Sequence, residues 1–447
     1  MAFQSHNLLL SFIIISFVAC SLQEDPLDDM YVGNSPSNVD DGGTSKSLII
    51  KQRPTNNILR LNRFVMLDAT SSSSSATKLN VNDYGAKGDG KTDDTQAFKK
   101  AWKEACSSGG AVILAVPQNN YLLKPITFSG PCKSQITMQI GGSIEASEDR
   151  SEYSEDTQHW VMFESVEKLT VEGGGTINGN GNTWWKNSCK KNPKLVCIDP
   201  NQAVTFYKCK NLIVENLTIK NGQQINVNIE ESMDVKVSGV TVKAPGDSPN
   251  TDGIHITNTK NIKILKTLIA TGDDCISIES GTQNLQVSDL TCGPGHGISI
   301  GSLGDTGSKE SVSGITVNGA KLSGTTKTWQ MLCMQGGSGS ASNIKFQNIE
   351  MDNVANPIII DQNYCDQKNP CKQKDSGIEI KNVLYENIKG TSASEVGVSL
   401  NCSESVPCEG IVLQNVKLQR EGDGEASKAS CQSVKLSYQG HVSPRCP

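Results

Sequence analysis

Short runs of β-branched and aliphatic residues recur along the chain from Leu169 onward, and each run is broken by Asn or Gly. The clearest runs cover residues 212–219, 235–242, 262–269, 285–291, 344–351, 378–388 and 411–418. Most of their starts lie about 23 to 34 residues apart. Self-similarity at this period predicts a stack of repeated coils, because one coil cannot bury its own apolar face.

The runs are too short and too rich in Asn for a leucine-rich horseshoe, and the combined Gly-His and Trp-Asp signature of a propeller is absent. The pattern therefore predicts an all-β chain folded as a single parallel β-helix. In that fold, residues one coil apart in sequence lie about 4.8 Å apart in space. A β-sandwich of the same strands is the alternative, but sandwiches favour strict alternation and tight hairpin turns.

Helical periodicity is nearly confined to residues 93–106, which follow Thr92 as a candidate N-cap. The apolar side chains predicted to share one face of this helix are Ala97, Phe98, Ala101, Trp102 and Ala105. A helix at the open end of a β stack hides the unpaired edge strands. We expect this helix to serve as such a cap.

The chain divides into three parts by composition. Residues 8–18 form an apolar run followed by the small residues 19–21, which predicts a signal peptide over residues 1–21 and a secreted protein. Residues 22–78 are polar and poorly periodic, as in a flexible linker or pro-segment. Residues 79–447 are expected to form the β-helix domain.

Composition excludes several classes of partner. Hydrophobic side chains make up 36% of the chain and the formal charge is −6, so neither wholesale disorder nor the basic footprint of a nucleic-acid-binding protein is indicated. Beyond the N-terminus, no apolar run approaches the roughly 20 residues of a membrane span. We expect a monomer with neither nucleic-acid nor membrane partners.

The 15 cysteines favour an oxidising compartment, and removal of Cys20 with the signal peptide leaves 14. Connectivity does not follow from one sequence. The pairs suggested by proximity are Cys106–Cys132, Cys275–Cys292, Cys365–Cys371, Cys402–Cys408 and Cys431–Cys446. No cysteine or histidine cluster has zinc-site spacing. The sequons at Asn216 and Asn401 permit glycosylation.

Acidic residues recur at the interval of one coil. Asp252 is followed about one coil later by Asp273 and Asp274, and His296 lies one further coil on. Each of these motifs alone is common in proteins without a catalytic role: Asp-Gly as a turn, paired aspartates as solvated loop charges, and Gly-His-Gly as a turn. The near-equal spacing of the three motifs instead predicts three carboxylates and an imidazole on one face of the stack.

Such a cluster suits glycoside hydrolysis. Clustered carboxylates repel one another unless one retains a proton. A glycosidase needs one protonated acid for the leaving oxygen and one carboxylate for the opposite face of the sugar. Because Asp273 and Asp274 are adjacent, a regular strand would direct them to opposite faces. A bend or bulge at Gly272 is therefore predicted, so that both carboxylates reach the same side.

The sequence resembles the plant polygalacturonases, a family of pectin-cleaving glycoside hydrolases with a right-handed parallel β-helix fold. The likeness covers roughly residues 79–446. The motifs that carry it are YGAKGDG at 84–90, GTINGNG at 175–181, NTD at 250–252, GDD at 272–274 and GHG at 295–297. Asn178 stands where the family usually has Asp.

The resemblance implies hydrolysis of α-1,4 bonds in polygalacturonic acid, the backbone of de-esterified pectin, with inversion and without a metal or other cofactor. It implies that Asp273 is the general acid, that Asp252 and Asp274 activate water, and that His296 keeps the acid protonated. The substrate-binding residues implied in the same way are Asn250, Gly297, Lys327 and Tyr364. It also implies action in the cell wall. Inversion predicts a separation of roughly 6.5–9.5 Å between the acid and base carboxyls.

One family motif is altered. The family carries Gly-Val-Arg-Ile-Lys-Thr-Trp about one coil after the histidine, where this chain has KTWQMLCMQ at 327–335. Aligning Lys327-Thr328-Trp329 with the motif keeps the lysine and requires an insertion of residues 331–334. Counting without gaps places Gln330 at the arginine and Leu332 at the lysine. Both registers lose the arginine, which predicts weakened or abolished turnover, and Cys333 in this segment has no evident partner.

Two other functions fit parts of the pattern. One is a non-catalytic pectin-binding protein of the wall or of pollen that keeps the fold. The other is a related hydrolase acting on a different backbone, such as rhamnogalacturonan. A pectate lyase fits less well, because the resemblance would then imply a calcium ion and an arginine base. Substitution of Asp273 by Asn separates catalysis from binding alone.

Overall fold

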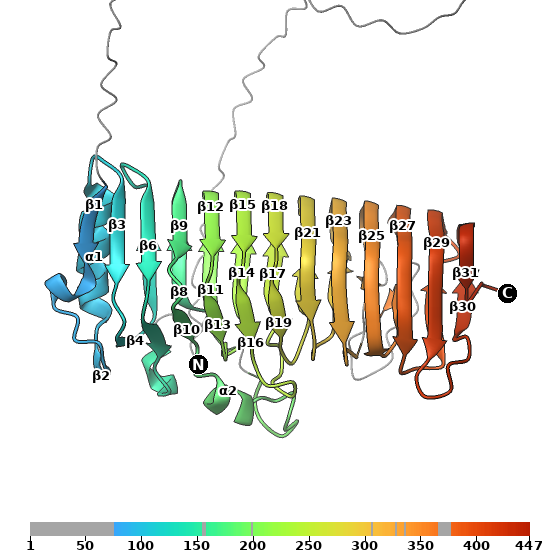
Figure 1. Ribbon diagram of the computed structural model, residues 1–447, viewed down its shortest axis with the longest axis horizontal. Helices are drawn as coiled ribbons and strands as arrows, with labels where there is room; N and C mark the ends of the chain where they lie inside the picture. Colours follow the sequence, from blue (N-terminus) through green and yellow to red (C-terminus); the bar gives the residue numbers. More distant parts are fainter. Residues whose placement is uncertain are drawn as a thin grey trace, which may run out of the picture. The chain divides into compact units, whose positions relative to one another are not determined.

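The computed structural model describes residues 76–153, 158–197, 200–304, 307–326, 329–334, 337–364 and 377–447. These residues form a right-handed parallel β-helix whose strands follow one another along a single axis (Figure 1). Every pairing between the described strands is parallel, which excludes the sandwich alternative. The predicted signal peptide and most of the predicted linker lie outside the described residues, as do Lys327, Cys365 and Cys371.

One face of the solenoid is a sheet of 11 described strands, each contributed by one coil. Its strands are β5 (Ile126–Ser129), β8 (His159–Glu164), β11 (Gln202–Tyr207), β14 (Val227–Glu230), β17 (Ile254–Thr257), β20 (Ile276–Ile278), β22 (Ile298–Leu303), β24 (Trp329–Met334), β26 (Ile358–Tyr364), β28 (Val396–Asn401) and β30 (Lys428–Gln432). This surface is called the short-strand sheet below, and the candidate acids lie at its edge.

The other described strands form a second sheet that wraps the remaining sides. They are β1 (Thr77–Asn80), β2 (Asp89–Asp93), β3 (Val112–Val116), β4 (Asn120–Leu123), β6 (Ile136–Ile140), β7 (Ser143–Ala146), β9 (Leu169–Glu172), β10 (Thr176–Asn178), β12 (Lys210–Glu215), β13 (Thr218–Lys220), β15 (Met233–Ser238), β16 (Thr241–Lys243), β18 (Lys260–Leu265), β19 (Leu268–Ala270), β21 (Gln283–Cys292), β23 (Lys309–Ser323), β25 (Ser338–Val354), β27 (Gly377–Ser392), β29 (Cys408–Arg420) and β31 (Val434–Ser443).

The coils are less uniform than the sequence period suggests. The interval is short between Ile254 and Ile276, which pair directly, and much longer between the paired Ile344 and Val383. One full coil, through Ile315 in β23, was missing from the predicted runs. Its strand carries Ser and Gly among the aliphatic residues, which weakens the apolar signal that identifies the other runs.

The core is a column of aliphatic side chains stacked from coil to coil. Buried residues occupy equivalent positions in successive coils, in the order Leu212, Val235, Ile262, Leu285, Ile315, Ile344, Val383 and Ile411. Fully burying one such side chain is worth about 1.5–3 kcal/mol. Because each column crosses every coil, the apolar surface that one coil cannot bury alone is covered by its neighbours.

The N-terminal end of the stack is closed by α1 (Thr95–Ser107), as predicted (Figure 1). Its buried face contains Phe98, Trp102 and the three alanines expected there. The Trp102 ring packs against Phe128 with centroids 5.1 Å apart, and its Nε1 donates to Ser129 O at 3.0 Å. A second helix, α2 (Asn182–Lys186), follows the GTINGNG motif, and two 3-10 turns cover Val81–Tyr84 and Arg150–Tyr153.

The predicted N-cap of α1 was wrong by two residues. The cap position is Asp94, and the Thr92 hydroxyl instead donates to Asp89 Oδ2 at 2.8 Å. The Asp94 carboxylate accepts hydrogen bonds from the backbone of Lys87 and Gly88, at 2.6 and 3.0 Å. It therefore anchors the YGAKGDG loop to the start of the helix.

Four of the five predicted disulfides are present: Cys106–Cys132, Cys275–Cys292, Cys402–Cys408 and Cys431–Cys446. The fifth, Cys365–Cys371, lies outside the described residues. A bridge between Cys189 and Cys197 was not predicted. Among the described residues, the free cysteines are Cys209 and Cys333, both buried, so the even count did not mean that every cysteine is paired.

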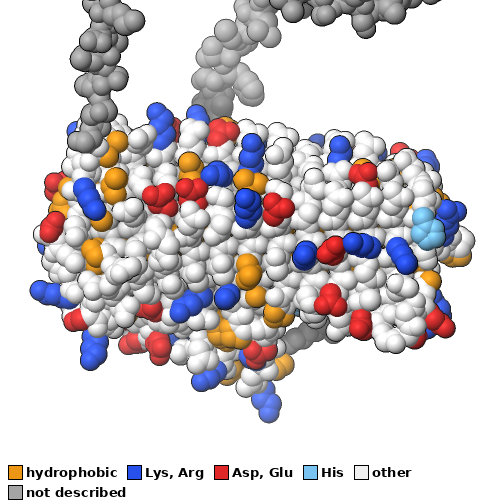
Figure 2. All heavy atoms as spheres, in the orientation of Figure 1, with side chains coloured by type: hydrophobic (Ala, Val, Ile, Leu, Met, Phe, Trp, Pro, Cys, Tyr) orange, Lys and Arg blue, Asp and Glu red, His pale blue; other side chains and the backbone are white. Residues whose placement is uncertain are grey.

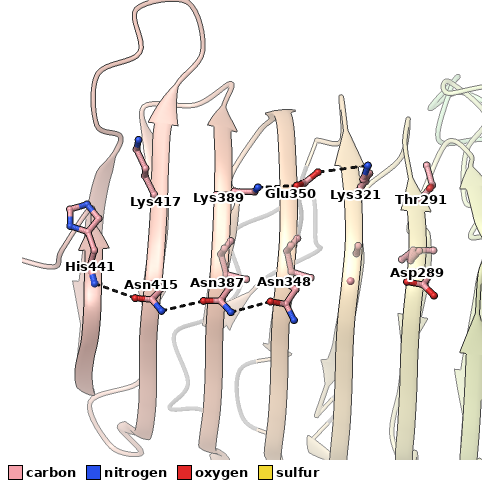
Figure 3. A pocket seen from close by; sticks show the side chains of 15 residues that line it. Asp289, Thr291, Lys321, Asn348, Glu350, Asn387, Lys389, Asn415, Lys417 and His441 are labelled. Atoms are coloured by element: carbon pink, nitrogen blue, oxygen red, sulfur yellow. Dashed lines mark hydrogen bonds and ion pairs between the residues drawn. The ribbon is translucent and has the colours of Figure 1, made fainter.

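An asparagine ladder holds one corner of the solenoid (Figure 3). Asn387 Nδ2 donates to Asn348 Oδ1 at 3.0 Å, and Asn415 Nδ2 donates to Asn387 Oδ1 at 3.2 Å. All three have φ between 50° and 56°, a left-handed conformation that Asn tolerates better than most residues. The ladder borders a hollow of about 810 Å³ that also contains Lys321, Lys389 and other charged residues.

Charge is interspersed on the face of the solenoid shown in Figure 2, where acidic and basic side chains alternate without a broad basic area. No described helix is both long enough and apolar enough to cross a membrane.

We predict that Asn387→Ala destabilises the fold by about 1–3 kcal/mol, because alanine loses two ladder bonds and is strained at this φ. Asn387→Gly should cost less, since glycine tolerates positive φ and loses only the hydrogen bonds. Urea denaturation should therefore rank the midpoints as wild type, then Gly, then Ala. Equal midpoints for the Gly and Ala variants would contradict the conformational part of this explanation.

Candidate active site

Three consecutive coils present the predicted acids just before their strands of the short-strand sheet. Asp252 precedes β17, Asp273 and Asp274 precede β20, and His296 precedes β22. Backbone hydrogen bonds between adjacent coils link these segments. Gly253 N donates to Asp274 O at 2.8 Å, and Cys275 N donates to Gly297 O at 2.7 Å. The stack therefore brings together residues that are more than 40 positions apart in sequence.

A bend at Gly272 presents both neighbouring aspartates, as predicted. A Cβ at Gly272 would lie 2.0 Å from Ser248 O, so only glycine lets the chain pass this close to the preceding coil. The Asp273 carboxylate accepts a hydrogen bond from Asp274 N at 2.9 Å, which fixes the turn. The Cys275–Cys292 disulfide ties the following residue to β21.

His296 is held directly against Asp273. Its Nδ1 lies 2.9 Å from Asp273 Oδ1, and its backbone N donates to Asp273 O at 2.8 Å. The two side chains are 33% and 22% exposed, so both face the solvent side of the site. The arrangement suits the predicted role of His296 in controlling the protonation of Asp273.

Ligand atoms of Asp273, Asp274 and His296 lie within 4.8 Å of one another, as in a possible cation site. However, His296 Nδ1 and Asp273 Oδ1 are within hydrogen-bonding distance of each other. This contact also suits proton transfer between the two side chains.

Two serines that sequence reasoning missed donate to the acids. Ser277 Oγ donates to Asp252 Oδ2 at 2.7 Å, and Ser299 Oγ donates to Asp274 Oδ2. His255, Ser277 and Ser299 occupy equivalent positions in β17, β20 and β22. The repeated Ile-Ser-Ile at 276–278 and 298–300 was the available signal, because its alternation directs both serines outward beside the acids.

Electrostatic repulsion leaves the cluster with a proton near neutral pH. Burial, followed by the charges of Asp252 and Asp273, raises the pKa of Asp274 to about 7, against the lowering effect of the Ser299 hydroxyl. A carboxylate next to two others is expected to behave in this way. The cluster therefore holds an acidic proton below about pH 7, as acid–base hydrolysis requires.

Two of the other candidate residues, Asn250 and Gly297, stand close to the acids in the chain. Asn250 has a φ of 53° and stands two residues before Asp252, whereas Gly297, with a φ of 90°, follows His296 and accepts the Cys275 N–H. Tyr364 ends β26, two coils beyond β22. Lys327 lies outside the described residues.

The pairing of β24 shows where residues 329–331 lie on the short-strand sheet. Strand β24 pairs with β22 through Ile298–Trp329, Ser299–Gln330 and Ile300–Met331. Gln330 therefore occupies the position one coil beyond Ser299, and Leu332 lies two residues further along the strand. Cys333 is buried without a disulfide partner, as its sequence context suggested.

Asn178 has a structural explanation. Its Nδ2 donates to Glu145 Oε2 at 2.7 Å, and its Oδ1 accepts from Asn221 Nδ2 at 3.1 Å. An aspartate here would place a second carboxylate against Glu145, whereas the amide satisfies both neighbours. The departure from the family pattern at this position therefore agrees with its surroundings.

Comparisons with known proteins agree with this geometry. Residues 106–443 match the family model described as "Glycosyl hydrolases family 28". The chain is 60% identical over 377 residues to a polygalacturonase of Malus domestica, covering 84% of this chain and 80% of the relative. It is 54% identical over 369 residues to polygalacturonase-2 of Solanum lycopersicum, covering 82% and 80% of the two chains.

Among solved structures, the endo-xylogalacturonan hydrolase of Aspergillus tubingensis superposes with a TM-score of 0.71, covering 82% of this chain and all of that one. Its sequence identity is 21%, so this likeness concerns the fold alone.

We predict that Asp274→Asn stabilises the folded protein at pH 8. Burial and the neighbouring carboxylates raise the pKa of Asp274 to about 7 from the ordinary 3.8 of an aspartate. The carboxyl therefore contributes most to stability at low pH and progressively less as pH rises through about 7. Asparagine does not ionise, so the variant lacks this pH dependence. At 1.36 kcal/mol per pKa unit, its free energy of unfolding should exceed that of wild type by up to about 4 kcal/mol.

The measurement is urea denaturation of wild type and Asp274→Asn at several pH values. Their difference in stability should grow from pH 4 to pH 7 and then level off. A difference that stays constant across this range would show that Asp274 ionises as an ordinary exposed carboxyl.

Proposed function

Because this chain belongs to family 28 of the glycosyl hydrolases, we propose that it hydrolyses α-1,4-galacturonosyl bonds of de-esterified pectin by inversion. The single observation that supports this proposal best is the gathering of Asp252, Asp273, Asp274 and His296 from three adjacent coils. The relatives named as polygalacturonases supply the substrate class.

Each acid has a distinct role in this proposal. Asp273, the more exposed carboxyl at 22%, donates its proton to the glycosidic oxygen, and His296 beside it favours the protonated state between turnovers. Asp252, 14% exposed, and Asp274 activate the water that attacks the opposite face of the sugar. Because its pKa is raised to about 7, Asp274 is protonated at the acidic pH of the reaction, so it orients the water while Asp252 accepts the water's proton.

Substrate carboxylates require cations near the acids in a chain whose formal charge is −6. We assign sugar contacts to Asn250, Gly297, Lys327 and Tyr364. The ungapped pairing of β24 places Gln330, rather than an arginine, beside Ser299. Loss of a charge-assisted contact worth about 1.5–3 kcal/mol weakens binding roughly ten- to hundredfold, so turnover is reduced.

Location in the cell wall follows from the same proposal. The apolar run at 8–18 supports export, and the disulfides suit an oxidising compartment. Of the two sequons, Asn216 is exposed between β12 and β13 and is open to glycosylation. The amide of Asn401 is instead held by Asp361 and Asn363, at 2.9 and 3.2 Å.

We predict that Asp273→Asn lowers turnover about 10²–10⁴-fold while leaving pectin binding intact, because it removes only the general acid. The measurement is reducing-sugar release from de-esterified pectin at acidic pH, combined with a pull-down on the same polymer. Asp289→Asn, a matched change outside the site, should retain activity. Wild-type protein that binds pectin without releasing sugar would identify a non-catalytic binding protein.

We also predict that Gln330→Arg, alone or with Leu332→Lys, lowers the KM for polygalacturonate about tenfold through a restored charge-assisted contact. Gln439→Arg adds the same charge on an exposed part of β31 and is the control. An unchanged KM in the Gln330→Arg variant would mean that this position does not meet the substrate.

A further inference from the structure

The short-strand sheet carries a second polar row beside the acids. Ile254 and Ile256 are buried in β17, so the alternation of the strand turns His255 and Thr257 outward. His255 is 15% exposed and lies next to Asp252, although no sequence motif assigned it a function. It is one of five histidines in the chain.

His255 contacts Asp252 through a serine. The His255 Nδ1 and Ser277 Oγ atoms lie 2.7 Å apart, and Ser277 Oγ donates to Asp252 Oδ2 at 2.7 Å. The direct distance from His255 Nδ1 to Asp252 Oδ2 is 3.8 Å. Because Ser277 gives its only proton to Asp252, its oxygen must accept from the His255 N–H.

The other ring nitrogen of His255 faces a second carboxylate. His255 Nε2 lies 3.6 Å from Glu279 Oε2, which also accepts from Thr257 Oγ1 at 3.1 Å. Both ring nitrogens therefore face acceptors and carry protons, which makes the ring a cation. Burial opposes this charge, but pairing with Asp252 and Glu279 raises the pKa of His255 to about 10.

Other charged groups surround this pair. Glu230 of β14 pairs in register with Thr257 on the preceding coil, while Asp273, Asp274 and His296 lie on the coils that follow. The His255 ring itself lies within 4 Å of the Asp252 carboxylate. Asp274, by contrast, has a serine hydroxyl as its nearest donor and carries the raised pKa.

We propose that His255 is a positioning residue that keeps Asp252 ionised, acting through the Ser277 hydroxyl, and that Glu279 holds the His255 ring charged and oriented. The effect is to direct the shared proton of the three carboxylates away from Asp252 and onto the Asp273–Asp274 pair. A hydrolase needs this separation, because the water-activating carboxylate must be ionised while the donor is protonated. The inference rests on the proposed function for the role of Asp252.

The kinetic test compares pH profiles of kcat/KM for wild type, Ser277→Ala and Ser277→Thr. Loss of the hydroxyl should raise the pKa of the acidic limb by about one unit and lower kcat about tenfold, with KM little changed. Ser277→Thr, which keeps a hydroxyl, should restore most of the loss. His255→Gln should reproduce the alanine variant, and His441→Gln, at an exposed histidine outside the site, should match wild type. An unshifted acidic limb in both Ser277→Ala and His255→Gln would overturn the proposal.

A second measurement does not depend on turnover. NMR titration of the imidazoles should show the His255 ring still charged at pH 8.5 in wild type, and losing its proton below pH 8 in Glu279→Gln, because the stabilising carboxylate is gone. A wild-type ring that titrates near 6.5 would refute the inference. A charged ring in a protein without pectin hydrolysis would instead refute the proposed function and leave the His255 network standing.

Discussion

Each coil of this protein can bury its apolar inner face only against the coils on either side of it, and the rest of the structure depends on that constraint. Parallel pairing in register holds the columns of Val, Ile and Leu in line across the stack. The same register spaces the outward side chains about 4.8 Å apart from coil to coil. Acids that recur once per coil are thereby forced into one cluster, even though like charges repel. The energy of the core thus maintains an arrangement that the acids alone would avoid.

The acids and the outward serines of adjacent coils have different roles in the site. Asp252, Asp274 and His296 stand before their strands, and the serines at 277 and 299 each donate to the acid of the preceding coil. The hydroxyls alone do not distinguish one carboxylate from the other. Their surroundings differ, because the His255 ring lies beside Asp252, whereas burial and the charges of Asp252 and Asp273 raise the pKa of Asp274 to about 7.

The altered segment at β24 keeps its place in the solenoid although it departs from the family motif. Met331 and Cys333 fill core positions beneath the sheet, and the backbone keeps its pairing with β22 and β26. Because the fold depends on the buried alternate residues, the outward positions of the same strand vary without loss of the coil. The solenoid can therefore stay intact while the protein binds an anionic substrate more weakly.

The sequence by itself determined the parallel β-helix, the capping helix and the coil-to-coil meeting of Asp252, Asp273, Asp274 and His296. These follow from periodicity, which can be read directly along the chain. Proximity in sequence only suggested the disulfide pairs. The sequence could not supply the missed coil through Ile315, the Cys189–Cys197 bridge or the register of residues 329–331. Nor could it identify His255 and Ser277 as partners of Asp252. Only the tertiary structure decided these points, because coil lengths vary and an outward side chain has a partner only once adjacent coils are aligned.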